Sequence, residues 1–209
     1  MSNKVDLNSY IFSKKAIIFD MDGTLLDTEP YHVKAWNHIA PEFGFKPFDC
    51  EFMKSVGGIP TVGIVKIIGE KNGINLDPIA VASRKTQVFR EIYLKEADIF
   101  DDIANYLYKA HDLGIKTALA TGSLMREVTI LLDKFNLKDK LDAIITSDNL
   151  KRPKPNPDIY LLALEKLGKK PDESLVFEDT PIGLQGAKAA NIACIHVTDG
   201  KIVNGPIEP

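Results

Sequence analysis

The sequence has few cysteines, no long apolar run and no excess of basic residues. Its two cysteines, Cys50 and Cys194, lie far apart and form no CxxC pair, so we expect two reduced thiols rather than a disulfide or a metal knuckle. The first fifteen residues are polar and lack the apolar core of a signal peptide. No apolar stretch approaches the length that spans a bilayer. We therefore expect a cytoplasmic protein with no membrane partner.

The charge balance is mildly acidic, with 26 Lys and Arg against 29 Asp and Glu and a net charge of −3. A nucleic-acid partner would require clustered basic residues, so none is expected. With 209 residues, of which 44% are apolar, the chain can form one large domain or a domain with a smaller companion. Nothing in the sequence indicates an obligate protein partner, and we expect a monomer or a weak oligomer.

Five short apolar runs have the composition of buried parallel strands. They cover residues 16–20, 116–121, 143–146, 175–178 and 193–197. Helical patterns at 124–135, 157–167 and 181–190 alternate with the later strands. This alternation predicts an α/β fold with a doubly wound parallel sheet, a Rossmann-like core whose ligands bind beyond the carboxyl ends of the strands.

The interval between the first two predicted strands is far longer than a crossover requires. It contains about ninety-five residues, with helical patterns near 31–40, 48–55, 62–71 and 78–96, and a further one at 101–113 leads into the second strand. We therefore predict a core of residues 1–27 and 97–209, and a helical insert at 28–96 that would sit over the strand ends as a lid. The tail 199–209 contains two Gly and two Pro and is expected to be irregular.

The first predicted strand ends in two aspartates, Asp20 and Asp22. Side chains two residues apart on an extended backbone point the same way, so both carboxylates should face one site while Met21 faces the other side. Two carboxylates that close repel each other unless a cation or a shared proton relieves them. Ordinary turn residues at a strand end are the alternative. An EF-hand calcium loop is excluded, because Gly23 is fourth rather than sixth and Tyr31 occupies position twelve.

Two further strand ends carry groups that suit an anion. The second strand ends in Thr121, Gly122 and Ser123 before a helix, and a hydroxyl, a glycine and free helix amides form either an anion site or a simple helix cap. The loop after the third strand holds Lys154 between two prolines, which stiffen it. This lysine could neutralise a phosphate and the carboxylate that attacks it, or belong to a solvated charge run.

The fourth strand ends in Glu178 and Asp179. These two acids could have a purely structural role, in which their charges complement the dipole of the following helix. Together with Asp20 and Asp22 they would form an oxygen-rich pocket suited to a small hard cation such as Mg²⁺. The four strand ends therefore predict one site that binds a metal ion and a phosphoryl group.

These residues resemble, in order, the four motifs of the haloacid dehalogenase (HAD) superfamily, across residues 15–197. The segment DMDGT at 20–24 is highly specific for that superfamily, and the predicted insert resembles its helical C1 cap. The segments DTEPYH at 27–32 and KPNPD at 154–158 are similar to the β-phosphoglucomutase-like group, above all to its fructose-1-phosphate and 6-phosphogluconate phosphatases. The resemblance implies a phosphatase that acts on a small phosphorylated metabolite.

The resemblance also implies a mechanism. Asp20 would attack the substrate phosphorus and form an aspartyl phosphate, and Asp22 would protonate the leaving oxygen and then deprotonate the attacking water. Mg²⁺ would be bound by the Asp20 carboxylate, the Asp22 backbone carbonyl and Asp179, with Glu178 in support. The phosphoryl oxygens would be held by Thr121, the amides near Gly122 and Ser123, and Lys154.

Residues of the insert bear on the choice of substrate. His32 resembles a histidine that contacts substrate in the mutase, and Lys85 resembles a cap lysine that reaches substrate, although both could lie on solvated helix faces. In β-phosphoglucomutase an arginine of a cap loop binds the distal phosphate of the bisphosphate, and this chain has Thr61 at the corresponding position. A neutral residue lacks the charged, bidentate grip of arginine, which favours hydrolysis over the mutase reaction unless a cap lysine substitutes.

Two other classes of protein share some of these features. A receiver-like signalling module would also carry an acidic cluster, a hydroxyl and a lysine, with Asp20 phosphorylated as its regulated state. Such modules are much shorter and lack a long helical insert. A catalytically inactive binding protein is the other alternative, but every expected catalytic position of this chain is filled.

Overall fold

The computed structural model describes residues 6–209, and their contacts divide the chain into two compact units. The first unit contains residues 6–27 and 99–209, and the second is the continuous segment Thr28–Asp98. Two short strands, β2 (Leu26–Asp27) and β3 (Asp98–Ile99), pair with each other where the chain leaves and re-enters the first unit.

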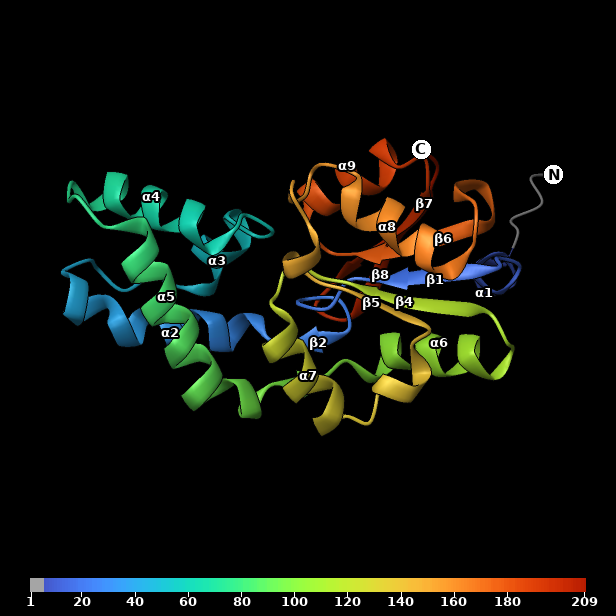
Figure 1. Cartoon of the computed structure of the whole chain (residues 1–209), viewed down its shortest axis with the longest axis horizontal. Coiled ribbons are helices and arrows are strands. Elements are labelled where there is room, and N and C mark those ends of the chain that lie inside the picture. Colours follow the sequence, from blue (N-terminus) through green and yellow to red (C-terminus); the bar gives the residue numbers. More distant parts are fainter. Residues whose placement is uncertain (1–5) are drawn as a thin grey trace. The chain divides into compact units, whose positions relative to one another are not determined.

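The first unit is built on a six-stranded sheet with the order β5-β4-β1-β6-β7-β8 (Figure 1). The strands are β1 (Ala16–Phe19), β4 (Lys116–Ala120), β5 (Ala143–Ile145), β6 (Ser174–Glu178), β7 (Ala193–Thr198) and β8 (Lys201–Ile207). The first five strands of this order are parallel, and β8 is antiparallel to β7. The prediction of an α/β fold with a doubly wound sheet is confirmed, and β1 lies between β4 and β6.

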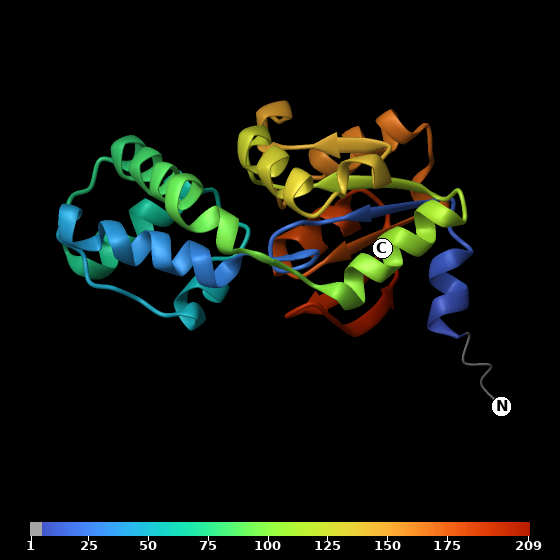
Figure 2. The ribbon, with the colours of Figure 1, turned by 90° about the horizontal axis from the view of Figure 1, so that it is seen from below.

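Helices cover both faces of this sheet (Figures 1 and 2). On one face lie α8 (Asp158–Leu167) and α9 (Pro181–Ala189), and on the other α6 (Asp101–Asp112) and α7 (Met125–Lys134). Every residue of β1 is buried, as expected of a parallel strand that is covered from both sides.

The second unit is built mainly from helices. Its helices are α2 (Glu29–Phe43), α3 (Cys50–Ser55), α4 (Thr61–Asn72) and α5 (Pro78–Val88), followed by a π-helical turn (Phe89–Tyr93) and a 3-10 turn (Leu94–Glu96). The single helix expected at 78–96 is therefore three consecutive segments. Trp36 is fully buried and has Phe45 and Phe48 as ring neighbours at 6.4 and 6.2 Å. Trp36 is therefore a core residue of the second unit.

The prediction of an irregular tail at 199–209 is wrong, because the chain returns as β8 along the edge of the sheet. Asp199 and Gly200 have φ values of 47° and 69°, and Thr198 pairs with Lys201 across them. An Asp-Gly pair of this conformation forms a two-residue hairpin turn whose twist matches that of the strands. Pro206 does not prevent pairing, since an edge strand uses the backbone groups of one side only.

A short helix that we did not predict, α1 (Leu7–Phe12), precedes β1. Asp6 caps it, because its carboxylate accepts a hydrogen bond from the Ser9 N–H at 3.1 Å. Only Ile11 of this helix is fully buried, so it has too little apolar periodicity to be recognised from sequence.

Asp142 links the starts of β4 and β5. Its carboxylate accepts hydrogen bonds from the Thr117 N–H at 2.9 Å and from the Lys116 ammonium, and its own N–H donates to the Thr117 carbonyl at 2.8 Å. Partial burial acts to raise the pKa of Asp142, but these hydrogen bonds outweigh it and hold the pKa below its ordinary value.

The substitution Asp142→Ala is expected to lower the free energy of unfolding by about 1 kcal/mol at pH 7. Because the pKa is lower in the folded state than in the unfolded state, this contribution is present above about pH 4 and is lost as the pH falls through the folded-state pKa. Urea unfolding of parent and variant at pH 7 and pH 3 measures it. The exposed Asp139 supplies a control, Asp139→Ala, and an equal Asp142→Ala difference at both pH values would contradict the expectation.

Candidate active site

The carboxyl ends of three adjacent strands form the candidate site. β1 ends at Phe19 and is followed by Asp20, β4 is followed by Thr121, and β6 ends at Glu178. Because β4 and β6 flank β1 in the sheet, these side chains meet at one edge. Met21, which stands between the two aspartates, is buried.

The Asp22 carboxylate is held by two hydroxyls. Its Oδ2 accepts hydrogen bonds from Ser123 Oγ at 2.7 Å and from Thr121 Oγ1 at 3.2 Å. The Ser123 N–H in turn donates to Thr121 Oγ1 at 3.0 Å, which shapes the turn after β4. Gly122 lies between them, and a Cβ there would meet no described atom within 4 Å. The Thr121 hydroxyl, which is expected to hold a phosphoryl oxygen, and the Ser123 hydroxyl thus fix the orientation of Asp22 here.

Lys154 bridges the two acidic strand ends. Its ammonium donates to Asp20 Oδ1 at 2.6 Å and to Glu178 Oε2 at 2.7 Å, and all three side chains are buried. The turn that carries the lysine is tied across its ends, since Arg152 forms a two-pronged ion pair with Asp158 at 3.0 and 2.6 Å. The lysine is therefore held in the site, as the proline-flanked sequence predicts.

Burial acts to raise the pKa of Asp20, the nearby Glu178 charge adds to this, and Lys154 only partly opposes it, so the pKa of Asp20 lies well above its ordinary value. Burial acts to lower the pKa of Lys154, but the charges of Asp20 and Glu178 outweigh it and leave that pKa well above its ordinary value. The site therefore favours a charged lysine and penalises additional negative charge on the carboxylates.

Asp179 is positioned by two residues of the turn after β1. Thr24, which is fully buried, donates from Oγ1 to Asp179 Oδ1 at 3.1 Å. Gly23 has a φ of +78°, and a Cβ at this position would lie 2.3 Å from Asp179 Oδ2. The glycine thus allows both the turn and the close approach of the carboxylate. Thr24 stands inside the DMDGT segment, and its contact with Asp179 is not evident from the spacing of that motif.

Three carboxylates form a group that could hold a metal ion. One oxygen each of Asp20, Glu178 and Asp179 lies within 4.8 Å of the others. The Asp22 side chain is turned to its hydroxyl partners, so its expected contribution to a metal is the backbone carbonyl. These three carboxylates outnumber the one neighbouring ammonium, that of Lys154. A small divalent cation that prefers oxygen ligands fits this group of carboxylates.

The two residues of the insert with predicted substrate contacts lie close together in the second unit. Lys85 Nζ is 2.6 Å from His32 Nδ1, and the His32 ring stacks on Phe89 with centroids 3.9 Å apart. The donor and acceptor roles in this hydrogen bond depend on the His32 tautomer. Lys85 is buried, which is at odds with a solvated helix face.

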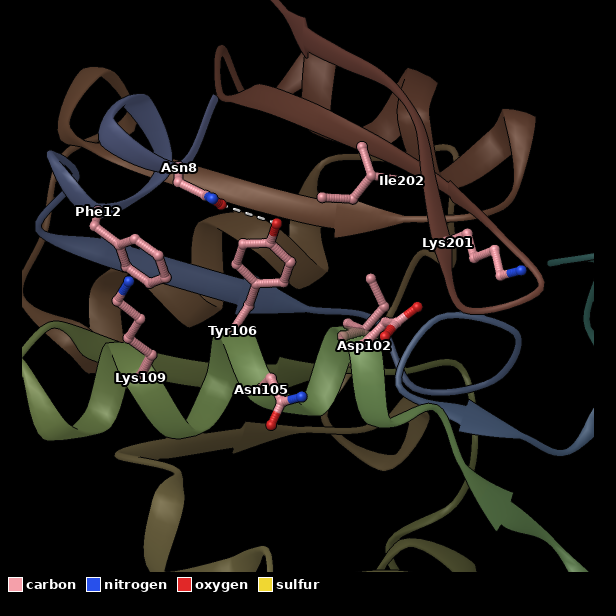
Figure 3. A pocket seen from close by; sticks show the side chains of 9 residues that line it. Asn8, Phe12, Asp102, Asn105, Tyr106, Lys109, Lys201 and Ile202 are labelled. Atoms are coloured by element: carbon pink, nitrogen blue, oxygen red, sulfur yellow. Dashed lines mark hydrogen bonds between the residues drawn. The ribbon is translucent and has the colours of Figure 1, made fainter. Parts of the chain in front are cut away.

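A hollow of about 510 Å³ lies elsewhere in the first unit, between α1, α6 and β8 (Figure 3). None of the predicted site residues lines it. The Tyr106 hydroxyl donates to Asn8 Oδ1 at 3.0 Å, and the Lys109 ammonium lies 4.4 Å from the centre of the Phe12 ring. These contacts attach the terminal helix to α6 and take no part in the candidate active site.

Known proteins share this sequence and this fold. The profile of the Haloacid dehalogenase-like hydrolase family matches residues 17–197. Fructose-1-phosphate phosphatase YqaB of Escherichia coli (strain K12) is 36% identical over 87% of this chain and 95% of that protein. Beta-phosphoglucomutase of Bacillus subtilis (strain 168) is 30% identical over 91% of this chain and 86% of that protein. The crystal structure of CbbY from Rhodobacter sphaeroides in complex with phosphate matches with a TM-score of 0.77 and 29% identity, over 88% of this chain and 85% of that one.

A doubly wound sheet with acids and a lysine at its carboxyl edge defines a hydrolase of the HAD class. The chain belongs to the haloacid dehalogenase-like hydrolase family, because the match spans most of it, and it is an enzyme with phosphatase activity. Helix α1 and strand β8 lie outside the matched residues. In the part of the chain that the structure describes, no helix combines the length and apolarity needed to cross a membrane.

Proposed function

We propose that this enzyme is a Mg²⁺-dependent phosphatase of small sugar phosphates that works through an aspartyl-phosphate intermediate. The observation that carries the proposal is the Lys154 ammonium 2.6 Å from Asp20 Oδ1, beside an Asp22 that two hydroxyls hold in place. The site thus combines a carboxylate proposed as nucleophile, a second acid and a fixed positive charge, with Asp20 and Lys154 buried and Asp22 half-buried.

Asp20 is the proposed nucleophile. Its carboxylate attacks the phosphorus, the bond to the sugar oxygen breaks, and the phosphoryl group is carried on Asp20 until water removes it. Lys154 offsets negative charge on the nucleophile and on the transferring phosphoryl group. The backbone amides that follow Thr121 supply further donors for the phosphoryl oxygens.

Asp22 is the proposed acid and base. It delivers a proton to the departing sugar oxygen and then accepts one from the water that attacks the aspartyl phosphate. Both transfers require a carboxyl group in a constant place, and the hydrogen bonds from Thr121 and Ser123 provide this restraint.

A Mg²⁺ ion would be held by the Asp20 carboxylate, the Asp22 backbone carbonyl and Asp179, with Glu178 in support. When bound, the ion supplies positive charge that neutralises the phosphoryl group and its nucleophile. Thr24 and the turn at Gly23 keep Asp179 in the position that this requires.

The sugar-phosphate substrate class is supported by the phosphatase relative, which is named for fructose 1-phosphate. Isomerisation of a phosphosugar is a second candidate activity, because another relative is named as a β-phosphoglucomutase. Thr61, the first residue of α4, stands where the mutase resemblance places an arginine, and this neutral side chain favours hydrolysis.

Phosphate release over a panel of phosphometabolites, in the presence of Mg²⁺, tests the proposed activity. The panel includes β-glucose 1-phosphate with its bisphosphate activator. Hydrolysis of sugar phosphates with no isomerisation supports the proposal. Isomerisation to glucose 6-phosphate that is faster than phosphate release would identify a mutase instead.

His32→Ala is expected to lower kcat/KM for phosphosugars by about tenfold or more and to change p-nitrophenyl phosphate hydrolysis less. The reason is that the residue is proposed to contact the sugar and not the phosphoryl group. His38→Ala is the matched control in the same helix, since this exposed histidine lies 3.1 Å from the Tyr93 hydroxyl. Equal losses on both substrates in His32→Ala would remove its proposed role in specificity.

A further inference from the structure

Glu178 is a buried carboxylate with all of its acceptor positions in use. Oε1 accepts hydrogen bonds from the Thr180 N–H at 3.0 Å and from Thr180 Oγ1 at 2.7 Å. Oε2 accepts from Lys154 Nζ at 2.7 Å and from the Tyr160 hydroxyl at 2.6 Å. A carboxylate offers about four lone-pair positions, so the orientation of Glu178 is fully specified by these donors.

Tyr160 is a partner of Glu178 that the proposed chemistry does not explain, and it shares the oxygen Oε2 with the site lysine. It is the third residue of α8, is fully buried, and belongs to the apolar cluster between α8, α9 and the sheet. A buried tyrosine needs a partner for its hydroxyl, but a phenylalanine would fill the same core without that need. The hydroxyl is therefore placed where it touches the acid that holds the site lysine.

Helix α9 has glycines at the two positions that face this pair. A Cβ on Gly183 would lie 2.0 Å from Glu178 Cδ, and a Cβ on Gly186 would lie 3.1 Å from Tyr160 Cε2. Larger residues at these positions would displace the carboxylate and the ring. The packing of α9 thus leaves the Tyr160–Glu178 pair in a single arrangement.

We propose that Tyr160 is a positioning residue of this enzyme, whose hydroxyl holds Glu178 so that Lys154 stays shared between Glu178 and Asp20. This inference rests on the proposed function, in which Lys154 serves the phosphoryl group. Without the hydroxyl, Oε2 of Glu178 keeps only the ammonium as a partner. The ammonium is then drawn toward Glu178 and away from Asp20 and the phosphoryl oxygens, and small displacements of such groups are costly in a preorganised site.

The test is Tyr160→Phe, which removes only the hydroxyl. Binding of inorganic phosphate in the presence of Mg²⁺ is measured by calorimetry, and hydrolysis of p-nitrophenyl phosphate is measured alongside. We expect the Kd for phosphate to rise about three- to tenfold and kcat/KM to fall by a similar factor, which corresponds to the net contribution of one typical hydrogen bond. A purely structural role would lower the melting temperature and leave the phosphate Kd unchanged.

Tyr106→Phe is the matched control, because the Tyr106 hydroxyl donates to Asn8 in the same unit, away from the candidate active site. This variant should have the parental Kd for phosphate and the parental kcat/KM. Parental phosphate affinity in a folded Tyr160→Phe overturns the inference. If that variant is not folded at the assay temperature, both titrations are repeated at a lower temperature at which it is folded, and parental affinity there overturns the inference equally. A parent that binds phosphate but hydrolyses no ester contradicts the proposed function alone, and the titrations still decide the role of Tyr160. A parent that binds no phosphate overturns both.

Discussion

Replacement of Asp20 by asparagine is expected to reduce phosphate release by at least about a thousandfold, because an amide cannot attack phosphorus as a carboxylate does. Asparagine has nearly the same shape, and Lys154 keeps Glu178 as its partner, so the fold should be retained. Initial rates with p-nitrophenyl phosphate and thermal melting by circular dichroism measure the two effects.

Asp112→Asn is a suitable control for this substitution, since Asp112 is an exposed residue at the end of α6 in the same unit. It should hydrolyse p-nitrophenyl phosphate at the parental rate. Asp20→Asn with parental activity would show that Asp20 is not the nucleophile. The number of turnovers in the parent separates an enzyme from a receiver-like module, because a module that retains its phosphate would stop after one.

Removal of divalent cations is expected to abolish activity, and Mg²⁺ is expected to restore it. The acids at the carboxyl ends of β1 and β6 outnumber the single Lys154 ammonium, and without a cation a phosphate monoester would enter a site with an excess of negative charge. Activity in EDTA, followed by titration with Mg²⁺, measures the dependence. Full activity without metal would contradict the proposed metal site.

Two variants locate the metal within this group of acids. Asp179→Asn should raise the Mg²⁺ concentration for half-maximal activity by about tenfold or more, because it removes a charged ligand. Thr24→Val should raise it less, since Thr24 only orients Asp179 through one hydrogen bond. An unchanged Mg²⁺ requirement in both variants would place the ion elsewhere.

Much of the fold of the first unit could be predicted from the sequence. The five parallel strands lie within about a residue of their expected bounds, because each is an apolar run of strand length between helical patterns. The edge strand β8 was missed although its Asp199-Gly200 turn is a strong hairpin signal, since the nearby glycines and Pro206 argued for an irregular end.

The candidate site was predictable where a residue directly follows a strand. Asp20, Thr121 and Asp179 stand at such positions, Asp22 lies two residues after Asp20, and the parallel sheet brings these strand ends to one edge. The roles of Thr24 and Tyr160 could not be read in the same way. Thr24 lies in the turn after β1 and Tyr160 lies in α8, yet both donate hydrogen bonds to acids at the end of β6. Sequence spacing does not show which side chains of different elements meet in the fold.

The sequence by itself determined the fold class, the strand ends that carry acids, and the lysine that accompanies them, because these follow from local apolar pattern and from the period-two alternation of an extended chain. Only the tertiary structure decided that the ammonium of Lys154 is shared between Asp20 and Glu178, and that the hydroxyls of Thr121 and Ser123 face Asp22. Those pairings depend on strand order and helix packing, which bring together residues that are far apart in the sequence. Lys154 and Asp20, for example, are more than a hundred positions apart in the chain.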